Sequence, residues 1–289
     1  QQAITMDTGI RFHTVVDEVT APFLAEMVRA TLTARFGEKV LGAGYRVFTT
    51  VQSDIQNAAV KAVNEGLLAY DLRHGWRGVE KTKNTLAQLS VAGGLWPAQV
   101  TKVNRNSIAA TLQDGRSVTV NWSGMSWARP YKSVNSLGGY PSKASQIVKE
   151  GDIIRLKPVG NTWLLRQIPN VQGQLVALHP ETGSIEALVG GFDFGVSQFN
   201  HSIQGWRQAG STMKPFIYAL ALERGFNPYS TVNDSPLTVG NWSPSNSDGR
   251  FMGPITLRRA LYLSRNLVSV RLLQAVGVER ARTYLDRFG

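Results

Sequence analysis

A block of short β-prone segments between residues 86 and 168 constrains the fold of this chain more than any other feature. The segments read WPAQVTKV, SIAATL, SVTVNW, DIIRLKPV and TWLLRQI, with turn sequences such as NRN, QDGR and KEGD between them. The Asp114-Gly115 and Glu150-Gly151 pairs suit tight hairpins, because glycine tolerates the positive φ that such turns require. Five short strands at this spacing predict a small barrel of the oligonucleotide- or oligosaccharide-binding (OB) kind.

Helical patterns flank this block on both sides. Before it, residues 20–36 and 54–72 carry apolar stripes at helical spacing, Ser53 is placed to cap the second helix, and 45–51 (YRVFTTV) is typical of a strand. Residues 73–84 lose all periodicity, which indicates a linker. After the block, 173–191 predicts a β-hairpin, and helices near 211–224, 255–263, 267–276 and 278–288 follow, with stops at Gly225, Gly277 and Gly289. We therefore predict an α+β protein with an inserted all-β domain, divided as 1–84, 85–168 and 169–289.

Composition excludes several kinds of site. The 289 residues include no cysteine, which excludes a disulfide framework, a thiolate nucleophile and a cysteine-based zinc site. The four histidines show no ligand spacing, so we expect neither a metal nor another cofactor. A chain without cysteine also suits an oxidising compartment such as a bacterial periplasm.

The positive charge of the chain, +11 in all, is concentrated in the β-prone block. Residues 85–168 contain ten Lys and Arg against three acidic residues, which favours a polyanionic partner. Four tryptophans lie among these cations, as in a nucleic-acid groove: Trp96, Trp122, Trp127 and Trp163. Tryptophans in small barrels more often fill the core, however, and no aromatic-basic RNA motif is present, so nucleic acid is not the partner we expect.

The chemically most informative segment is QAGSTMKPFIYALALERG, residues 208–225. On a helix, Ser211 and Lys214 share one face, so a hydroxyl nucleophile and an amine base come within hydrogen-bond reach. Pro215 is tolerated only in the first helical turn, which places Ser211 at the helix start. There the helix dipole stabilises an alkoxide or oxyanion and disfavours a protonated lysine. Gly210 leaves the approach to the serine open.

A structural explanation fits the same residues. Twenty-one serines and ten lysines give about 0.7 chance Ser-x-x-Lys matches in a chain of this length. A capping serine followed by a solvated lysine would account for this one. LYLSRNLVSV supplies a second element, because Ser264 and Asn266 interrupt two helical segments in a loop that can face a cleft. Serine can relay a proton there and asparagine can bind a substrate amide, although a helix-breaking cap would look alike.

Taken together, these elements resemble a known family. Ser-x-x-Lys followed by Ser-x-Asn, behind a strand hairpin, is the pattern of penicillin-binding proteins and class A β-lactamases. FNHSIQGWRQAGSTMKPFIYALALERGFNP and GPITLRRALYLSRNLVSVRLL look like the serine helix and second-motif region of class A penicillin-binding proteins of the 1A type. GYRVFTTVQSDIQNAAVKAVNEGL resembles the strand and helix that precede the transpeptidase of that family. The resemblance spans most of residues 40–289.

The resemblance implies a truncated serine D,D-transpeptidase fold in which Ser211 attacks the D-Ala-D-Ala carbonyl. Lys214 would be the base, Ser264 would relay the proton, Asn266 would hold the substrate, and the Ser211 N–H would form half of the oxyanion hole. Implied partners are peptidoglycan stem peptides, β-lactam antibiotics and a regulatory protein at the inserted domain, whose charge also suits anionic wall polymers. In the family a glycosyltransferase domain and a membrane segment, absent here, anchor the protein in the inner membrane with the transpeptidase in the periplasm.

The chain departs from the family pattern after Asn266, since no Lys-Thr-Gly or Lys-Ser-Gly follows. That strand supplies the second oxyanion N–H in the family, so the fragment is expected to be catalytically incomplete. Two rival readings stay open: a non-catalytic wall-binding or protein-binding module, and a β-lactamase or β-lactam sensor with the same serine. A β-lactamase needs a carboxylate base for its hydrolytic water. No residue between Ser264 and the end marks a clear candidate, which leaves Asp234 and Asp248 earlier in the chain.

Overall fold

The computed structural model describes residues 19–80, 82 and 84–288, and the chain divides into two compact units, 1–206 and 207–289. The first 18 residues of the predicted first segment and the predicted stop at Gly289 lie outside the described residues. Within the described helices, none combines the length and apolar character needed to cross a bilayer. The predicted domain limits at 84/85 and 168/169 stay a prediction.

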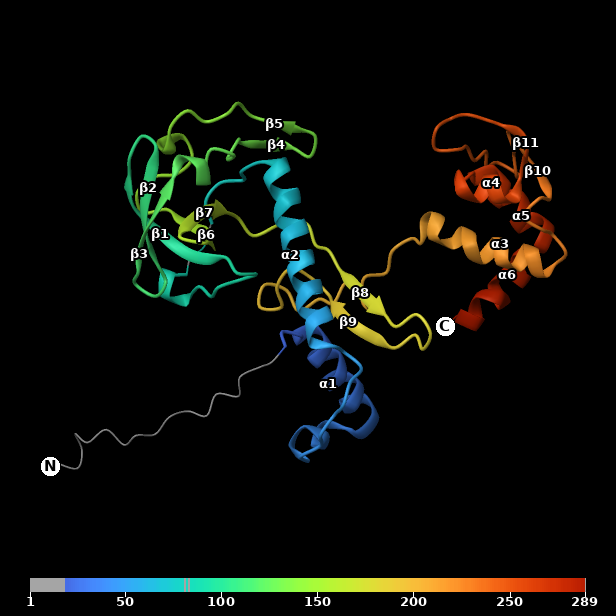
Figure 1. Ribbon diagram of the computed structural model, residues 1–289, viewed down its shortest axis with the longest axis horizontal. Coiled ribbons are helices and arrows are strands. Elements are labelled where there is room, and N and C mark those ends of the chain that lie inside the picture. The colour runs from blue at the N-terminus through green and yellow to red at the C-terminus, as the bar shows by residue number, and fades with distance from the viewer. Residues whose placement is uncertain (1–18, 81, 83, 289) are drawn as a thin grey trace. The chain divides into compact units, whose positions relative to one another are not determined.

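The first unit contains the predicted β-prone domain (Figure 1). Its five-stranded antiparallel sheet has the order β3-β2-β1-β6-β7, and β3 also lies against β7. The strands are β1 (Trp96–Val103), β2 (Ser107–Leu112), β3 (Ser117–Asn121), β6 (Ile153–Val159) and β7 (Thr162–Arg166). Alternate residues of β2 point inward and are fully buried, as period-two geometry requires. All five predicted strands are confirmed, and a small pair, β4 (Tyr131–Ser133) and β5 (Ser136–Leu137), lies beside them.

Turn predictions in this sheet were only partly right. Asp114-Gly115 joins β2 to β3, where Thr111 pairs with Ser117. Glu150-Gly151, predicted to be a hairpin, instead forms a turn that leads from a short 3-10 segment into β6. The tight β6–β7 hairpin is formed by residues 160–161, between the paired Val159 and Thr162.

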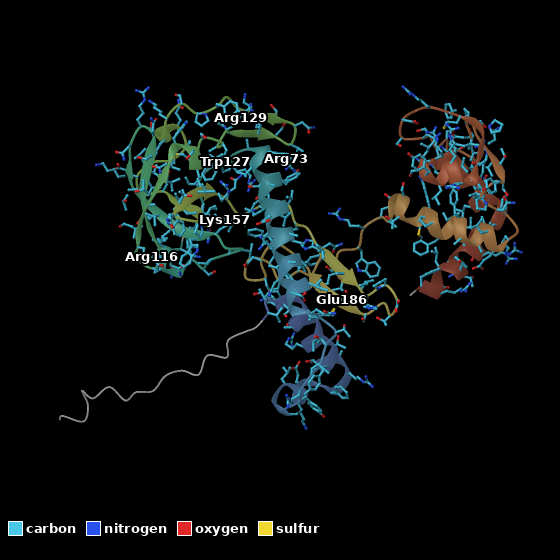
Figure 2. The ribbon with its side chains drawn as sticks, in the orientation of Figure 1. Arg73, Arg116, Trp127, Arg129, Lys157 and Glu186 are labelled. Carbon is cyan, nitrogen blue, oxygen red and sulfur yellow. The ribbon has the colours of Figure 1, made fainter. Side chains whose placement is uncertain are left out.

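The four tryptophans of this domain are partly buried against its apolar core, as expected for a small barrel. Trp127 donates its indole N–H to the carbonyl of Leu165 at 3.0 Å. Arg116 lies over the ring of Trp96, with its guanidinium carbon 5.0 Å from the centroid. Figure 2 shows Arg116, Arg129 and Lys157 at separate places on this domain. The structure therefore accounts for the tryptophans as core and for the cations as a distributed charge.

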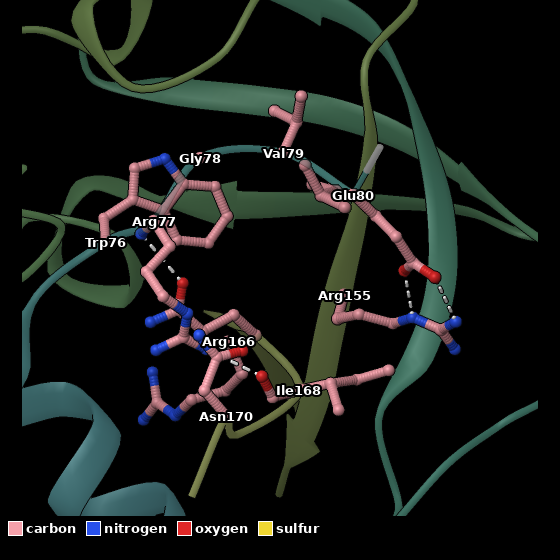
Figure 3. A pocket seen from close by; sticks show the side chains of 11 residues that line it. Trp76, Arg77, Gly78, Val79, Glu80, Arg155, Arg166, Ile168 and Asn170 are labelled. Atoms are coloured by element: carbon pink, nitrogen blue, oxygen red, sulfur yellow. Dashed lines mark hydrogen bonds and ion pairs between the residues drawn. The ribbon is translucent and has the colours of Figure 1, made fainter. Parts of the chain in front are cut away.

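The linker predicted at residues 73–84 begins two residues later than expected, since Arg73 and His74 still belong to helix α2 (Ser53–His74), and its residues 76–80 are attached to the barrel. Trp76 is buried in the barrel core and forms an isolated bridge with Pro130. Arg77 pairs with Asp71. Two of the three guanidinium nitrogens of the buried Arg155 donate to the Glu80 carboxylate, one of them at 2.8 Å (Figure 3). The segment is therefore irregular, as its lack of periodicity predicts, but Trp76 and Glu80 attach it to the barrel.

This anchor yields a stability prediction. Glu80→Ala leaves the Arg155 charge buried without its carboxylate, so unfolding free energy should fall by about 3 kcal/mol. The control is Arg29→Ala, which breaks an exposed pair with Glu26 on a helix of the same unit and should leave stability nearly unchanged. Urea denaturation followed by tryptophan fluorescence measures both. Equal midpoints for the two variants would contradict the anchoring role of Glu80.

The rest of the first unit packs two helices on a hairpin. Helix α1 (Pro22–Phe36) and α2 (Ser53–His74) both contact β9 (Ile185–Val189), which pairs with β8 (Leu175–Leu178) as predicted. The N-cap of α2 is Gln52, not Ser53. The predicted strand at 45–51 is wrong, because only its end reaches a partner: Thr50 Oγ1 donates to the Ile185 carbonyl at 2.6 Å. Without a neighbouring strand, the apolar alternation of this segment leaves Phe48 and its neighbours exposed.

The second unit is mainly helical. A 3-10 turn (Gly210–Met213) leads into α3 (Lys214–Glu223), and α4 (Leu257–Tyr262), α5 (Asn266–Val276) and α6 (Val278–Leu285) follow. A two-stranded pair, β10 (Thr231–Asp234) and β11 (Gly253–Thr256), precedes α4. The apolar faces of α3, α4, α5 and α6 form one core around Ala221, Ala260 and Leu272, each fully buried. The predicted helix near 255–263 thus begins two residues late, because its first residues pair in β11.

Candidate active site

Ser211 lies where the sequence placed it, at the start of a helix. It is exposed in the 3-10 turn that runs directly into α3, and Pro215 occupies the first turn of that helix. Gly210 has a φ of +55°, a left-handed conformation that favours glycine, while a Cβ there would meet open space. The glycine is therefore required for the backbone turn before the serine.

Lys214 is buried behind this hydroxyl, with 7% of its surface exposed. Its Nζ donates to the Ser264 carbonyl at 2.6 Å, to Ser264 Oγ at 2.8 Å and to Asn266 Oδ1 at 2.7 Å. Ser264 Oγ in turn donates to Ser211 Oγ at 3.1 Å. The structure thus brings together all four residues singled out from the sequence: Ser211 and Lys214 from the 3-10 turn and the start of α3, and Ser264 and Asn266 from the turn after α4 and the start of α5.

The connection between nucleophile and amine differs from the one expected. Within the described residues, the contact from Lys214 Nζ to Ser211 Oγ runs through the hydroxyl of Ser264 and not by a direct hydrogen bond. All three donor positions of a protonated lysine are taken by Ser264 and Asn266. The three-residue spacing places Ser211 and Lys214 on one face, but the contacts with Ser264 and Asn266 decide where the Lys214 amine points.

Burial and charge both make Lys214 a better base. The pKa of Lys214 is lowered from 10.5, first because burial disfavours the charged ammonium and second because of the positive charge of Arg265. A lowered pKa raises the fraction of neutral amine near neutral pH, which is the form that can accept a proton.

Ser264 has an unusual backbone conformation, with φ +53°. It follows α4 in a Schellman arrangement: the Ser264 N–H donates to Leu261 and the Arg265 N–H donates to Ala260, both at 2.9 Å. Glycine usually occupies this position, and a serine there costs about 1 kcal/mol. The conformation directs both the carbonyl and the hydroxyl of Ser264 to Lys214.

The sequence did not predict the buried polar cluster that lies beneath this turn: Asp234 and Asp248 were considered for a hydrolytic water, and Asn246 was not singled out. Asp234, Asn246 and Arg265 are 0%, 4% and 5% exposed. Arg265 Nε donates to Asp234 Oδ2 at 2.7 Å, and Asn246 Nδ2 donates to Asp234 Oδ1 at 2.8 Å. Arg265 also pairs with the half-exposed Asp248 at 2.9 Å. No periodic signal marks Asp234 or Asn246, because both lie in or beside an irregular segment.

Comparison with known proteins gives two domain matches. Residues 68–171 match the model of the penicillin-binding protein OB-like domain, and residues 173–289 match that of the penicillin-binding protein transpeptidase domain. The chain is 43% identical over 305 residues to "Penicillin-binding protein 1A" of Pseudomonas aeruginosa, covering 100% of this chain and 37% of the relative. It is 39% identical over 308 residues to the protein of that name from Escherichia coli, covering 100% of this chain and 36% of the relative.

A solved structure agrees with these matches. The crystal structure of penicillin-binding protein 1A from Haemophilus influenzae superposes with a TM-score of 0.80 at 35% identity, over 96% of this chain and 43% of that chain. The chain thus spans somewhat more than a third of the length of the curated relatives it matches.

Proposed function

The chain belongs to the class A penicillin-binding proteins of the 1A type, and on that premise we propose that it carries the acylation site of a serine D,D-transpeptidase. The observation that carries the proposal is the chain of contacts from Lys214 through Ser264 to Ser211. The substrate is the D-Ala-D-Ala end of a peptidoglycan stem peptide, and β-lactams acylate the same serine.

Acylation begins with attack of Ser211 Oγ on the carbonyl carbon of the penultimate D-alanine. The Ser211 hydroxyl proton moves through Ser264 Oγ to the neutral amine of Lys214, while a bond forms between Ser211 Oγ and the carbonyl carbon. Collapse of the oxyanion breaks the amide bond, and Ser264 passes a proton to the leaving D-alanine. An amine of a second stem peptide then attacks the ester and restores the Ser211 hydroxyl.

Asn266 has two tasks in this scheme. Its Oδ1 accepts from Lys214 at 2.7 Å, which orients the amine. We also propose that this side chain hydrogen-bonds the substrate amide, the role that the family pattern implies for Asn266. The Ser211 N–H, in the 3-10 turn that leads into α3, is our candidate for one oxyanion donor.

The two carboxylates considered for a hydrolytic role are engaged elsewhere. Asp234 is fully buried, and both Asp234 and Asp248 bind Arg265. Neither is thus free to activate a water at an acyl-enzyme. This supports transfer to an amine over rapid β-lactam hydrolysis.

Fluorescent penicillin labelling tests the proposal. We expect the full-length protein that contains this chain to form one stable covalent adduct, and mass spectrometry of a digest should place it on the peptide that contains Ser211. Heat-denatured protein is the control for non-specific labelling. An adduct elsewhere, or none, would refute the transpeptidase assignment.

For the whole protein we propose peptidoglycan synthesis in the bacterial periplasm, with a glycosyltransferase and a membrane anchor in parts outside this sequence. We also propose that the domain predicted at 85–168, with its net charge of +7, meets a regulatory protein or anionic wall polymers. These assignments derive from family membership and charge.

A further inference from the structure

We propose that Asn246 is a positioning residue for acylation: it caps α5 from a remote loop and thereby fixes Ser264 and Asn266 around Lys214. The inference rests on the proposed function, and it adds a residue outside the Ser-x-x-Lys and Ser-x-Asn elements to the machinery of the site.

The first step is the unsatisfied start of α5. The first N–H groups of a helix lack intrahelical partners, and the N-cap side chain usually accepts from them. In α5 the N-cap is Arg265, which makes no capping hydrogen bond. Asn246 Oδ1 takes over this task from 20 residues away, since it accepts from the Asn266 N–H at 2.8 Å and from the Leu267 N–H at 3.4 Å.

The second step is the orientation of the Asn266 amide. Its Nδ2 donates to the carbonyl of Ser245 at 3.0 Å, so its Oδ1 is the atom that faces Lys214 Nζ. The loop residues 245 and 246 therefore hold both the backbone and the side chain of Asn266. If this loop moved, the amide could turn its NH₂ group toward the amine and lose the contact.

The third step is that Asn246 itself has one possible orientation. Its Nδ2 donates both hydrogens, to Asp234 Oδ1 at 2.8 Å and to the Arg250 carbonyl at 2.9 Å, while its Oδ1 accepts from α5. Asp234 is fixed in turn by Arg265. Both polar atoms of this buried amide are hydrogen-bonded, so the position of Asn246 fixes the position of the first residues of α5.

The consequence concerns rate. Lys214 receives its three contacts from Ser264 and Asn266, which flank Arg265 in a turn with a left-handed residue. A displacement of this turn by about 1 Å lowers the rate of a positioned reaction by up to about 100-fold. Asn246→Ala removes the remote cap and should slow acylation at each correctly folded site by about tenfold to 100-fold.

The experiment uses the full-length protein and measures the acylation rate constant with fluorescent penicillin, normalised to the labelling end point of each variant. A residue that serves stability alone lowers the end point and leaves the rate constant per active site unchanged. The variants are Asn246→Ala, Asn246→Asp and the charge-conserving swap Asn246→Asp with Asp234→Asn. Asn241→Ala, an exposed asparagine of the same loop, is the matched control and should react like the wild type.

We expect Asn246→Asp to react slowly, because it places two carboxylates face to face. The swap should have an acylation rate constant at least tenfold higher than that of Asn246→Asp. A rate constant for Asn246→Ala within twofold of wild type would overturn the inference. Loss of folding in every Asn246 variant, including the swap, would overturn it too, since Asn246 would then serve the fold alone. Failure of the wild type to label at all would refute the proposed function instead.

Discussion

Lys214→Ala is expected to lower the acylation rate constant by about 1,000-fold or more, the upper part of the range for loss of a general base. Lys214→Arg should be equally slow. Arginine retains the positive charge and several N–H donors for Ser264 and Asn266, but it stays protonated and cannot accept the Ser211 proton. Stopped-flow acylation with a chromogenic β-lactam measures both variants.

The two substitutions separate a base from a tether. If Lys214→Arg kept a tenth of the wild-type rate, the amine would be needed only to orient Ser264 and Asn266. The base assignment would then be wrong, although Ser211 could still be the nucleophile.

The pH dependence of this reaction follows from the lowered pKa of Lys214. Acylation should accelerate as pH rises through that pKa, which lies below 10.5, because only the neutral amine takes up the proton. The free energy of unfolding should also rise with pH, because Lys214 binds its proton more tightly in the unfolded chain than in the folded protein. The contribution of this group to stability is therefore greatest above 10.5 and is lost as pH falls through the lowered pKa.

The second large effect concerns the cluster beneath the site. Asp234→Ala should destabilise the protein by about 3–5 kcal/mol, because it leaves the buried guanidinium of Arg265 without its buried partner. Asp248→Ala is the internal control, since it removes the other carboxylate of the same arginine, whose side chain is 49% exposed. That pair is screened by solvent, so the second variant should unfold near the wild-type midpoint.

Thermal unfolding monitored by circular dichroism distinguishes the two carboxylates. If both midpoints fell equally, the buried Asp234–Arg265 pair would contribute no more to stability than the exposed Asp248–Arg265 pair. A wild-type midpoint for Asp234→Ala would mean that residues 246–250 rearrange in the folded variant and give Arg265 another partner.

The barrel was predictable because each strand carries its own evidence. Ile108, Ala110 and Leu112 alternate with more exposed residues, and a turn sequence bounds every segment. The serine helix was predictable for a similar reason, because Pro215 can occupy only its first turn. Local signals of this kind survive whatever tertiary structure surrounds them.

The misses all depend on distant partners. Residues 45–51 have the pattern of a strand, but a strand also requires a hydrogen-bonding neighbour, and β9 meets only the end of this segment. Asn246 caps a helix that begins 20 residues later, and no spacing rule connects such a pair. The route from Lys214 to Ser211 through Ser264 likewise depends on how two segments 50 residues apart come together.

Ser264 marks a place where thermostability and turnover oppose each other. Its left-handed backbone after α4 is a position at which glycine would relieve local strain, so selection for heat resistance alone would favour glycine. That exchange would also delete the hydroxyl between amine and nucleophile. A programme that raises the thermal stability of this protein by placing glycine at helix ends should therefore leave Ser264 unchanged.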